Sequence, residues 1–197
     1  MTASLPPAAP GHALTLLFTA EQIHRRIDAM ADALAADLPP GELHCVAILQ
    51  GSFVFVADLS RALANRGISL IVDFVTFSSY GNGTTHSGTV TLKHDLSLPV
   101  AGRHVLVVDD IIDTGMTLQT FCRLLVERGA ASIRTCVLID KPARRRVAIQ
   151  ADVVGFAVGD VFVVGYGLDY AGRYRHLPCL AALTLDPAPH RDHAHAE

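Results

Sequence analysis

The sequence predicts an α/β fold with a mostly parallel central sheet flanked by helices. Two observations lead to this prediction. Short segments rich in β-branched residues alternate along the chain with segments of helical periodicity. Several of the strand-like segments, such as 105–108 and 133–139, are continuously apolar, which is typical of parallel strands that helices cover on both faces.

The helices are predicted from their caps and their apolar faces. Thr19 and Gln22 have the spacing of a capping box, and apolar residues follow at helical spacing as far as Leu34. Two prolines and a glycine at 39–41 end this helix. Two further helices are expected over 53–66 and 117–128, because each has an apolar face and is followed by glycine.

Strands are predicted where apolar and β-branched residues run without a helical period. The expected strands are 44–49, 70–77, 89–93, 105–108, 133–139, 153–157 and 161–164. Segment 78–88 contains three glycines and many small polar residues, and it is too long for a tight turn. We expect it to be either disordered or a mobile functional loop.

The length of 197 residues fits one domain with a substantial core. We expect residues 1–18 to form a flexible arm, 19–185 to form the single domain and 186–197 to form a flexible tail. The tail carries His190, His193 and His195, which we expect to be solvated. No apolar run is long enough to cross a bilayer, and no secretory signal begins the chain. We therefore expect a cytoplasmic protein with no membrane partner.

Charge and cysteine content exclude other classes. The net charge of −3 argues against a dedicated nucleic-acid binder, so no nucleic-acid partner is expected. Four widely spaced cysteines form no C-x-x-C pair and lie in or beside apolar segments. They are interpreted as small buried thiols in a reducing compartment, which argues against a zinc site.

The most informative segment is 105–117, where an apolar strand runs into three acids and the start of a helix. A doubly wound sheet binds its ligand at such a strand end. Adjacent carboxylates suit a sugar diol or a sugar–metal complex, and the backbone of a Thr-Gly-x-Thr turn can direct N–H groups at a phosphate. The segment therefore predicts a ribose 5-phosphate site made by Asp109, Asp110, Asp113, Thr114, Gly115, Met116 and Thr117.

An ordinary strand-to-helix connection, with Thr117 near the helix cap, is the alternative interpretation of this segment. Acids and threonine are common in such loops. Three acids within five residues fit that interpretation poorly, because like charges held close together cost free energy unless cations offset them. We therefore favour a ligand site.

Segment 105–117 resembles the phosphoribosyl pyrophosphate loop of the type I phosphoribosyltransferases. Four further motifs resemble the hypoxanthine-guanine members of that family, particularly the bacterial ones, and they occur in the family's order. They are Leu49-Gln50-Gly51-Ser52, Ser78-Ser79-Tyr80-Gly81, Ile139-Asp140-Lys141-Pro142 with Arg144 to Arg146, and the run from Val163 to Tyr170. The resemblance extends from about Thr19 to Leu183.

The resemblance implies a type I phosphoribosyltransferase fold, in which a small hood covers the base. The hood is expected to come from the N-terminal segment and from about 153–185. The implied reaction is purine salvage: ribose 5-phosphate moves from phosphoribosyl pyrophosphate to N9 of hypoxanthine or guanine, giving IMP or GMP and pyrophosphate. The family also implies Mg²⁺ as the cofactor and assembly as a homodimer or homotetramer.

The resemblance further implies roles for the ribose-side residues. Asp109 and Asp110 would hold the ribose hydroxyls and the magnesium ion, while the loop at 114–117 would bind the 5-phosphate. Asp113 would be catalytic, taking or sharing the N7 proton as N9 attacks. Asp109 stands where the family often has Glu, and hydrogen bonding can absorb the missing methylene.

The implied purine site consists of Lys141, Phe162, Val163 and Asp169. Lys141 would donate to the oxygen at C6 and repel the amino group of adenine, while Phe162 would stack on the base and the Val163 backbone would read its edge. Taken alone, Lys141 would more often be a solvated strand end and Phe162 a core residue. Asp169 would also coordinate the magnesium ion carried by pyrophosphate.

Gln50, Gly51 and Arg175 are implied to bind pyrophosphate, although Arg175 taken alone could be an ordinary surface arginine. Many family members carry Lys or Arg at the position of Gln50, and the bond from Gln50 to Gly51 is often cis. We expect this loop to act mainly through its backbone. Ser79 and Tyr80 head the 78–88 loop, which would close over the reacting centre and exclude water.

Two other functions compete with this interpretation. A regulatory module that senses a purine-linked ligand would usually gain a nucleic-acid-binding domain or a basic face, and this chain shows neither. A nearer alternative is an enzyme that prefers xanthine or guanine, and the sequence does not rank these bases. Arg144 to Arg146 are interpreted as a solvated basic patch rather than an RNA site, given the negative net charge.

Overall fold

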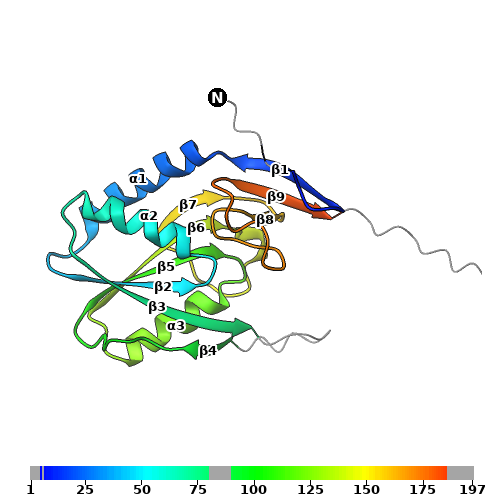
Figure 1. Ribbon diagram of the computed structural model, residues 1–197. Coiled ribbons are helices and arrows are strands. Elements are labelled where there is room, and N and C mark those ends of the chain that lie inside the picture. Colours follow the sequence, from blue (N-terminus) through cyan, green and yellow to red (C-terminus); the bar gives the residue numbers. More distant parts are fainter. Residues whose placement is uncertain (1–4, 6, 80–89, 186–197) are drawn as a thin grey trace, which may run out of the picture.

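The computed structural model describes residues 5, 7–79 and 90–185, which contain a six-stranded and a three-stranded sheet. Neighbouring strands of the larger sheet are parallel, except for the antiparallel pair at one edge. The predicted α/β fold with a mostly parallel sheet is therefore confirmed (Figure 1). In spatial order the strands are β4 (Val90–His94), β3 (Leu70–Ser79), β2 (Leu43–Leu49), β5 (His104–Ile112), β6 (Ser132–Asp140) and β7 (Val153–Ala157).

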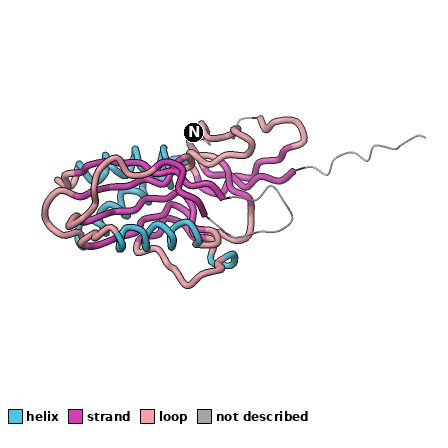
Figure 2. Tube along the Cα trace, turned by 90° about the horizontal axis from the view of Figure 1, so that it is seen from below, coloured by secondary structure: helices cyan, strands magenta, loops and turns pink. Residues whose placement is uncertain are grey.

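Helices cover both faces of the larger sheet (Figure 2). Cys45 and Ala47 of β2 belong to the apolar cluster under α1 (Ala20–Asp37) and α2 (Phe53–Ala64). The alternate residues Val46 and Ile48 belong to the cluster that includes the buried face of α3 (Met116–Glu127). Because successive strand residues point to opposite faces, a strand covered on both sides must be continuously apolar.

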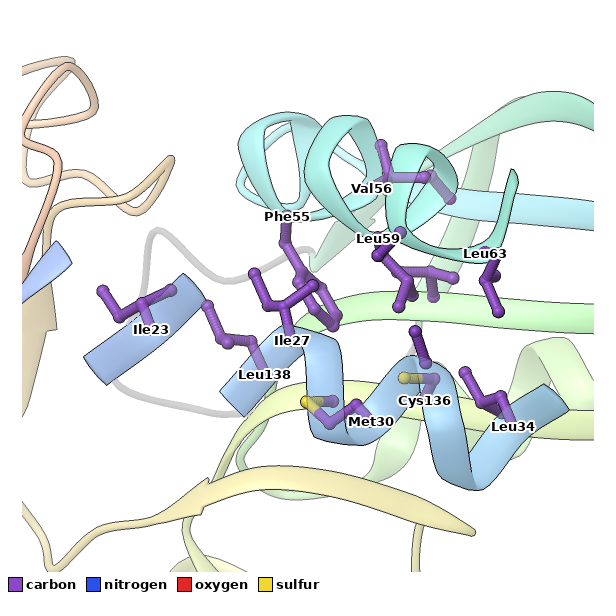
Figure 3. Close-up of a cluster of buried hydrophobic side chains, with 14 of the residues drawn as sticks. Ile23, Ile27, Met30, Leu34, Phe55, Val56, Leu59, Leu63, Cys136 and Leu138 are labelled. Atoms are coloured by element: carbon purple, nitrogen blue, oxygen red, sulfur yellow. The ribbon is translucent and has the colours of Figure 1, made fainter. Parts of the chain in front are cut away.

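The core beneath α1 and α2 contains many of the largest buried side chains. Figure 3 shows these side chains gathered between the two helices and β6. Burying each of them stabilises the fold by roughly 1.5–3 kcal/mol relative to exposure. The cluster includes Ile23, Ile27, Met30 and Leu34 of α1, Phe55, Leu59 and Leu63 of α2, and Cys136 and Leu138 of β6.

The predicted capping box begins α1. Thr19 is the N-cap: its hydroxyl oxygen accepts from the Gln22 backbone N–H at 3.2 Å, and the Gln22 side-chain oxygen accepts from the Thr19 N–H at 2.8 Å. Leu38, directly before the two prolines, is the extended C-cap residue. Both ends of this helix are therefore specified by neighbours in the sequence.

The signature strand is longer than predicted. We expected the strand to end at Val108, but β5 continues through the acids to Ile112, because pairing with β6 continues as far as Ile112 opposite Asp140. The turn then closes on Gly115, and α3 begins at Met116. The two adjacent acids, Asp109 and Asp110, thus lie within the sheet rather than on a free loop.

The three-stranded sheet forms the hood and corrects two predictions. It consists of β1 (His12–Phe18), β9 (Leu180–Leu185) and β8 (Phe162–Val164), all antiparallel. The flexible arm predicted for 1–18 is wrong for 12–18, because these residues pair with β9 and pack Leu14 and Leu16 on the hood's own apolar cluster. The hood also does not begin near 153, since β7 pairs with β6 in the larger sheet.

The three cysteines 45, 136 and 179 are buried, and Cys122 is partly buried. Burial raises the pKa of the Cys45 thiol to about 12 and that of Cys122 to about 11. These thiols are therefore protonated at neutral pH and behave as small apolar side chains.

Within the described ranges, no helix has the length and hydropathy of a membrane span. The tail with its three histidines lies outside these ranges.

Leu59→Ala should lower the free energy of unfolding by about 2–5 kcal/mol, because Leu59 is fully buried and its loss leaves a cavity. Val126→Ala is the control, since 66% of Val126 is exposed, and it should change that free energy by less than about 0.5 kcal/mol. Urea unfolding followed by circular dichroism measures both. Equal losses in the two variants would contradict this description of the core.

Candidate active site

A cavity of about 650 Å³ opens at the carboxyl ends of the parallel strands. This is where a doubly wound sheet binds its ligand, because several strand ends and helix starts converge there. Most of the residues predicted for the site line this one cavity. They are Gln50, Gly51, Asp109, Asp110, Asp113, Thr114, Gly115, Thr117, Lys141, Phe162, Val163, Asp169 and Arg175.

Met116 is not part of this lining, and the side chains of Ser79 and Tyr80 lie outside the described part of the chain. Met116 is the first residue of α3, and its backbone N–H donates to the Thr114 hydroxyl at 3.4 Å. Ser79 ends β3, and Tyr80 lies outside the described residues. The proposed closing role of Ser79 and Tyr80 therefore stays a prediction.

Asp109 and Asp110 lie side by side at the floor of the cavity. Burial raises the pKa of Asp109 well above its usual value, and the charge of Asp110 raises it further. Burial also raises the pKa of Asp110, although hydrogen bonds and the charge of Arg175 lower it in part. Two carboxylates held this way favour a ligand that brings positive charge or hydroxyl donors.

Gly51 gives Asp110 the space it occupies. A Cβ atom on residue 51 would lie 1.7 Å from Oδ2 of Asp110, so any side chain there would displace the carboxylate. The backbone of Gly51 is also approached from the other side, because a Cβ on Gly167 would lie 2.1 Å from the Gly51 carbonyl oxygen. The loops after β2 and β8 therefore meet at a contact between two glycines.

The oxygen ligands of this site fit a magnesium ion only in part. Carboxylate oxygens are the ligands that Mg²⁺ prefers, and a cation bound beside Asp109 and Asp110 would oppose the effect of burial, which raises the pKa of both carboxyls. Among the described residues, however, no three His, Cys, Asp or Glu side chains are close enough to hold a metal. Asp109, Asp110 and Asp169 therefore form no protein-only metal site, and the remaining ligands would have to come from substrate.

The turn before α3 is held from outside by the segment that follows β6. The Lys141 N–H donates to the Ile112 carbonyl, and the Arg146 N–H donates to the Thr114 carbonyl, both at 3.0 Å. Gly115 has a φ of +85°, and a Cβ there would lie 2.7 Å from Ile149. Glycine is thus required for both the left-handed backbone and the close packing. Fixed in this way, the turn presents the start of α3 to the cavity, where an anion is favoured.

Lys141 is buried, with 5% of its surface exposed, so it is not the solvated strand end that its residue type alone would suggest. Burial lowers the pKa of its ammonium group, and the charge of Asp113 opposes that shift. Phe162, in contrast, exposes 51% of its surface at the cavity, although its neighbour Val163 is buried. A buried cation and an open aromatic ring that line the same cavity can together bind a flat ligand that carries an oxygen acceptor.

Arg144 and Arg146 are exposed, as the interpretation of a solvated patch predicts, whereas Arg145 is only partly exposed. Arg144 lines the cavity, with its Nε 2.8 Å from Oδ1 of Asp113 and its Nη1 2.9 Å from Asp160. Arg145 pairs with Asp140 and donates to the Asp113 carbonyl at 2.7 Å. A short 3₁₀ helix, Pro142–Arg144, folds these side chains back toward the strand ends.

Arg175 and Asp169 form the third wall of the cavity. Arg175 is 2.7 Å from Asp169 and donates to the Gly167 carbonyl at 2.7 Å, with a longer contact of 3.4 Å to the Gln50 side chain. Asp169 also accepts from the Gly172 N–H at 2.8 Å. The arginine is thus held in place from three sides.

The cis peptide of the loop after β2 is the Leu49–Gln50 bond, one residue before the Gln50–Gly51 bond considered from the sequence.

The sequence model of one protein family, described as the phosphoribosyl transferase domain, matches residues 17–171 of this chain. The chain belongs to this family. It is 41% identical over 168 residues to the hypoxanthine-guanine phosphoribosyltransferase of Bacillus subtilis (strain 168), an alignment that covers 85% of this chain and 92% of the relative. It is 46% identical over 140 residues to the hypoxanthine phosphoribosyltransferase of Escherichia coli (strain K12), covering 71% and 77%.

Other phosphoribosyltransferases add to this likeness. The bifunctional protein TilS/HprT of Listeria innocua is 43% identical over 168 residues, but the match spans only 26% of that longer protein. A solved hypoxanthine phosphoribosyltransferase of Trypanosoma cruzi superimposes with a TM-score of 0.82 at 39% identity, covering 89% of this chain and 97% of the other. The family resemblance and the type I phosphoribosyltransferase fold predicted from the sequence are thereby confirmed.

Asp109→Asn should stabilise the ligand-free phosphoribosyltransferase at pH 7.5, because it removes one of two buried negative charges. A carboxyl whose pKa is raised on folding binds more protons in the folded state than in the unfolded state, so its contribution to stability falls as pH rises. We expect the variant to melt about 2–4 °C higher at pH 7.5, and the difference to shrink as pH approaches 4. Calorimetric melting across that range measures it, and a gain independent of pH would contradict the explanation.

Proposed function

We propose that this protein transfers ribose 5-phosphate from phosphoribosyl pyrophosphate to N9 of hypoxanthine or guanine. The products are IMP or GMP and pyrophosphate, so the protein acts in purine salvage. One observation carries the proposal. The cavity joins the ribose-phosphate signature of β5 and α3 to a buried Lys141 and an open Phe162 ring. Such a cavity suits a sugar phosphate at one end and a 6-oxopurine at the other.

The sugar phosphate is bound at the end of β5. The turn from Thr114 to Thr117 receives the 5-phosphate through backbone N–H groups and the start of α3, and Asp109 and Asp110 accept hydrogen bonds from the ribose hydroxyls. These hydroxyl donors replace the water that burial has removed from the two carboxylates. The ribose is thereby held with C1 open to the purine side of the cavity.

The departing pyrophosphate lies between the loops after β2 and β8. Gly51 allows close approach to the backbone, and Arg175 supplies a charge that Asp169 and the Gly167 carbonyl hold in place. A magnesium ion bound with the substrate would supply positive charge to neutralise the pyrophosphate. Asp169 on one side of the cavity, or Asp109 and Asp110 on the other, would be its protein ligands, and substrate oxygens would complete its coordination. Gln50 takes part mainly through its backbone.

The purine is held by Phe162, Val163 and Lys141. Phe162 stacks on the base, the Val163 backbone reads its edge, and Lys141 donates to the oxygen at C6. Asp113 takes or shares the N7 proton as N9 attacks C1 and the bond to pyrophosphate breaks. Arg144 contacts Oδ1 of Asp113 at 2.8 Å, which leaves Oδ2 for the purine.

The protein is further proposed to be cytoplasmic and to assemble as a homodimer or homotetramer. Val72 and Phe74 of β3 are 41% and 39% exposed, on the sheet face that α1 and α2 cover farther along. Exposed apolar side chains of this kind favour an interface. Light scattering on the purified protein tests the assembly, and a monomer at micromolar concentration would refute it.

Nucleotide formation tests the proposed function directly. The protein is mixed with phosphoribosyl pyrophosphate, magnesium and one purine at a time. Hypoxanthine and guanine should give nucleotide, adenine should react roughly 10⁴-fold less efficiently, and excess chelator should abolish the reaction. Product from xanthine alone would support that competing specificity. Ligand binding without product from any base would instead support a sensor.

Lys141→Gln tests how the base is selected. Loss of a charged donor in a buried site should lower kcat/KM for hypoxanthine by roughly 10–100-fold, and the discrimination against adenine should fall, because an amide can also accept from an amino group. Steady-state kinetics with both bases measures the ratio. Unchanged discrimination would place Lys141 outside the base site.

Asp113→Asn should lower kcat by roughly 10²-fold or less while leaving both KM values nearly unchanged, as expected when proton acceptance in the transition state is lost. Asp160→Asn is the matched control. Asp160 also pairs with Arg144 but does not line the cavity, so its variant should retain turnover. Normal turnover of Asp113→Asn with a raised purine KM would make Asp113 a binding residue instead.

A further inference from the structure

We infer that Tyr170 is a positioning residue that sets the orientation of the Phe162 ring for the incoming purine. Support for Tyr170 comes in turn from His12 and Tyr174, which links the base site to the N-terminal strand of the hood. This inference rests on the proposed function, in which Phe162 stacks on the base.

The Phe162 ring is half exposed and packs against the ring of Tyr170. Phe162 begins β8, a three-residue strand at the edge of the hood sheet, and 51% of its surface is exposed. The ring centroids of Phe162 and Tyr170 are 5.6 Å apart with an interplanar angle of 90°. An edge-to-face pair directs the positive edge of one ring at the negative face of the other, so it favours a defined mutual orientation.

Tyr170 is itself packed against His12 of β1. Their ring centroids are 5.3 Å apart at 80°, again an edge-to-face arrangement. His12 is held in turn by Tyr174, whose hydroxyl lies 2.6 Å from Nδ1 of His12 and accepts from the Ala9 N–H at 3.1 Å. The result is a continuous row of rings from Phe162 at the purine site to His12 of β1 and Tyr174.

Hydrogen bonds and side-chain contacts fix the backbone from Tyr170 to Tyr174. Tyr170 and Arg173 exchange two backbone hydrogen bonds of 3.2 and 3.0 Å, and Tyr174, which is buried, has a left-handed φ of 74°. A residue other than glycine keeps such a φ only where surrounding contacts enforce it. Here the contacts of the Tyr174 hydroxyl with Ala9 and His12 provide that constraint.

Asp169 and Tyr170 are adjacent in one turn, but their side chains serve different parts of the proposed site. Its neighbour Asp169 pairs with Arg175 at 2.7 Å on the pyrophosphate side, whereas the Tyr170 ring packs on Phe162 at the purine side. Loss of the Tyr170 ring should therefore weaken purine binding first. Binding of phosphoribosyl pyrophosphate should change little, because Arg175, which is proposed to bind it, is held by Asp169 and not by that ring.

Steady-state kinetics on three variants of the full chain test the inference. Tyr170→Leu should raise the KM for hypoxanthine at least fivefold and change the KM for phosphoribosyl pyrophosphate less than twofold. Tyr170→Phe keeps the ring and should behave as the parent. Phe156→Leu is the control: it removes another aromatic pair, Phe18 with Phe156 at 3.9 Å, away from the cavity lining, and it should lower the Tm without changing either KM.

Three results would overturn the inference: equal increases in both KM values for Tyr170→Leu, unchanged kinetics of that variant, or a Tyr170→Phe variant that resembles Tyr170→Leu. A parent protein that forms no nucleotide from any purine would refute the proposed function instead. In that case calorimetric titration of the parent and Tyr170→Leu with hypoxanthine still tests the pairing, and equal affinities would contradict it.

Discussion

The carboxylates of Asp109 and Asp110, buried side by side at the end of β5, impose the constraint on which the rest of the site depends. Burying charged groups next to each other is costly, and here it raises the pKa of both. The fold tolerates the pair because Gly51 leaves space for Asp110 and because the charge of Arg175 opposes part of the shift. A ligand that brings hydroxyl donors or a cation relieves the remaining cost, and this relief favours substrate binding.

The other walls of the cavity are formed by the segments after β6 and β8, and both are arranged around the carboxyl end of β5. The segment after β6 must fold back to hold the turn before α3, and in doing so it carries Lys141 into a buried position and Arg144 into the cavity. The loop after β8 must approach Gly51, which requires Gly167 at the point of contact. Each wall therefore contributes a charged or aromatic group only because its backbone is already fixed against a neighbouring loop.

The hood is a separate layer with its own apolar cluster. Its three strands come from the two ends of the described chain, and its exposed edge carries Phe162. The Phe162 ring is half exposed on this short edge strand, so the packing of Tyr170 against it matters for the geometry of the base site. The core sheet thus positions the sugar phosphate, while the hood positions the purine.

By itself, the sequence determined the features that depend on near neighbours. The capping box of α1, the apolar strands and the acid-rich segment that ends β5 were all predictable, because periodicity, caps and motif spacing are local properties. Family motifs also identified most of the cavity lining, including Lys141 and Phe162, whose residue types alone favoured other roles. The continuation of β5 to Ile112 was missed, since it depends on pairing with β6.

Only the tertiary structure decided how distant segments meet. Residues 12–18 look like a frayed end in the sequence, and they become a strand because β9, more than 160 residues away, offers an edge to pair with. Arg144 and Arg145 look like a solvated patch, and they become partners of Asp113 and Asp140 because a 3₁₀ turn folds them back. Such contacts have no local signal, since their free energy comes from surfaces that are brought together only when the whole chain folds.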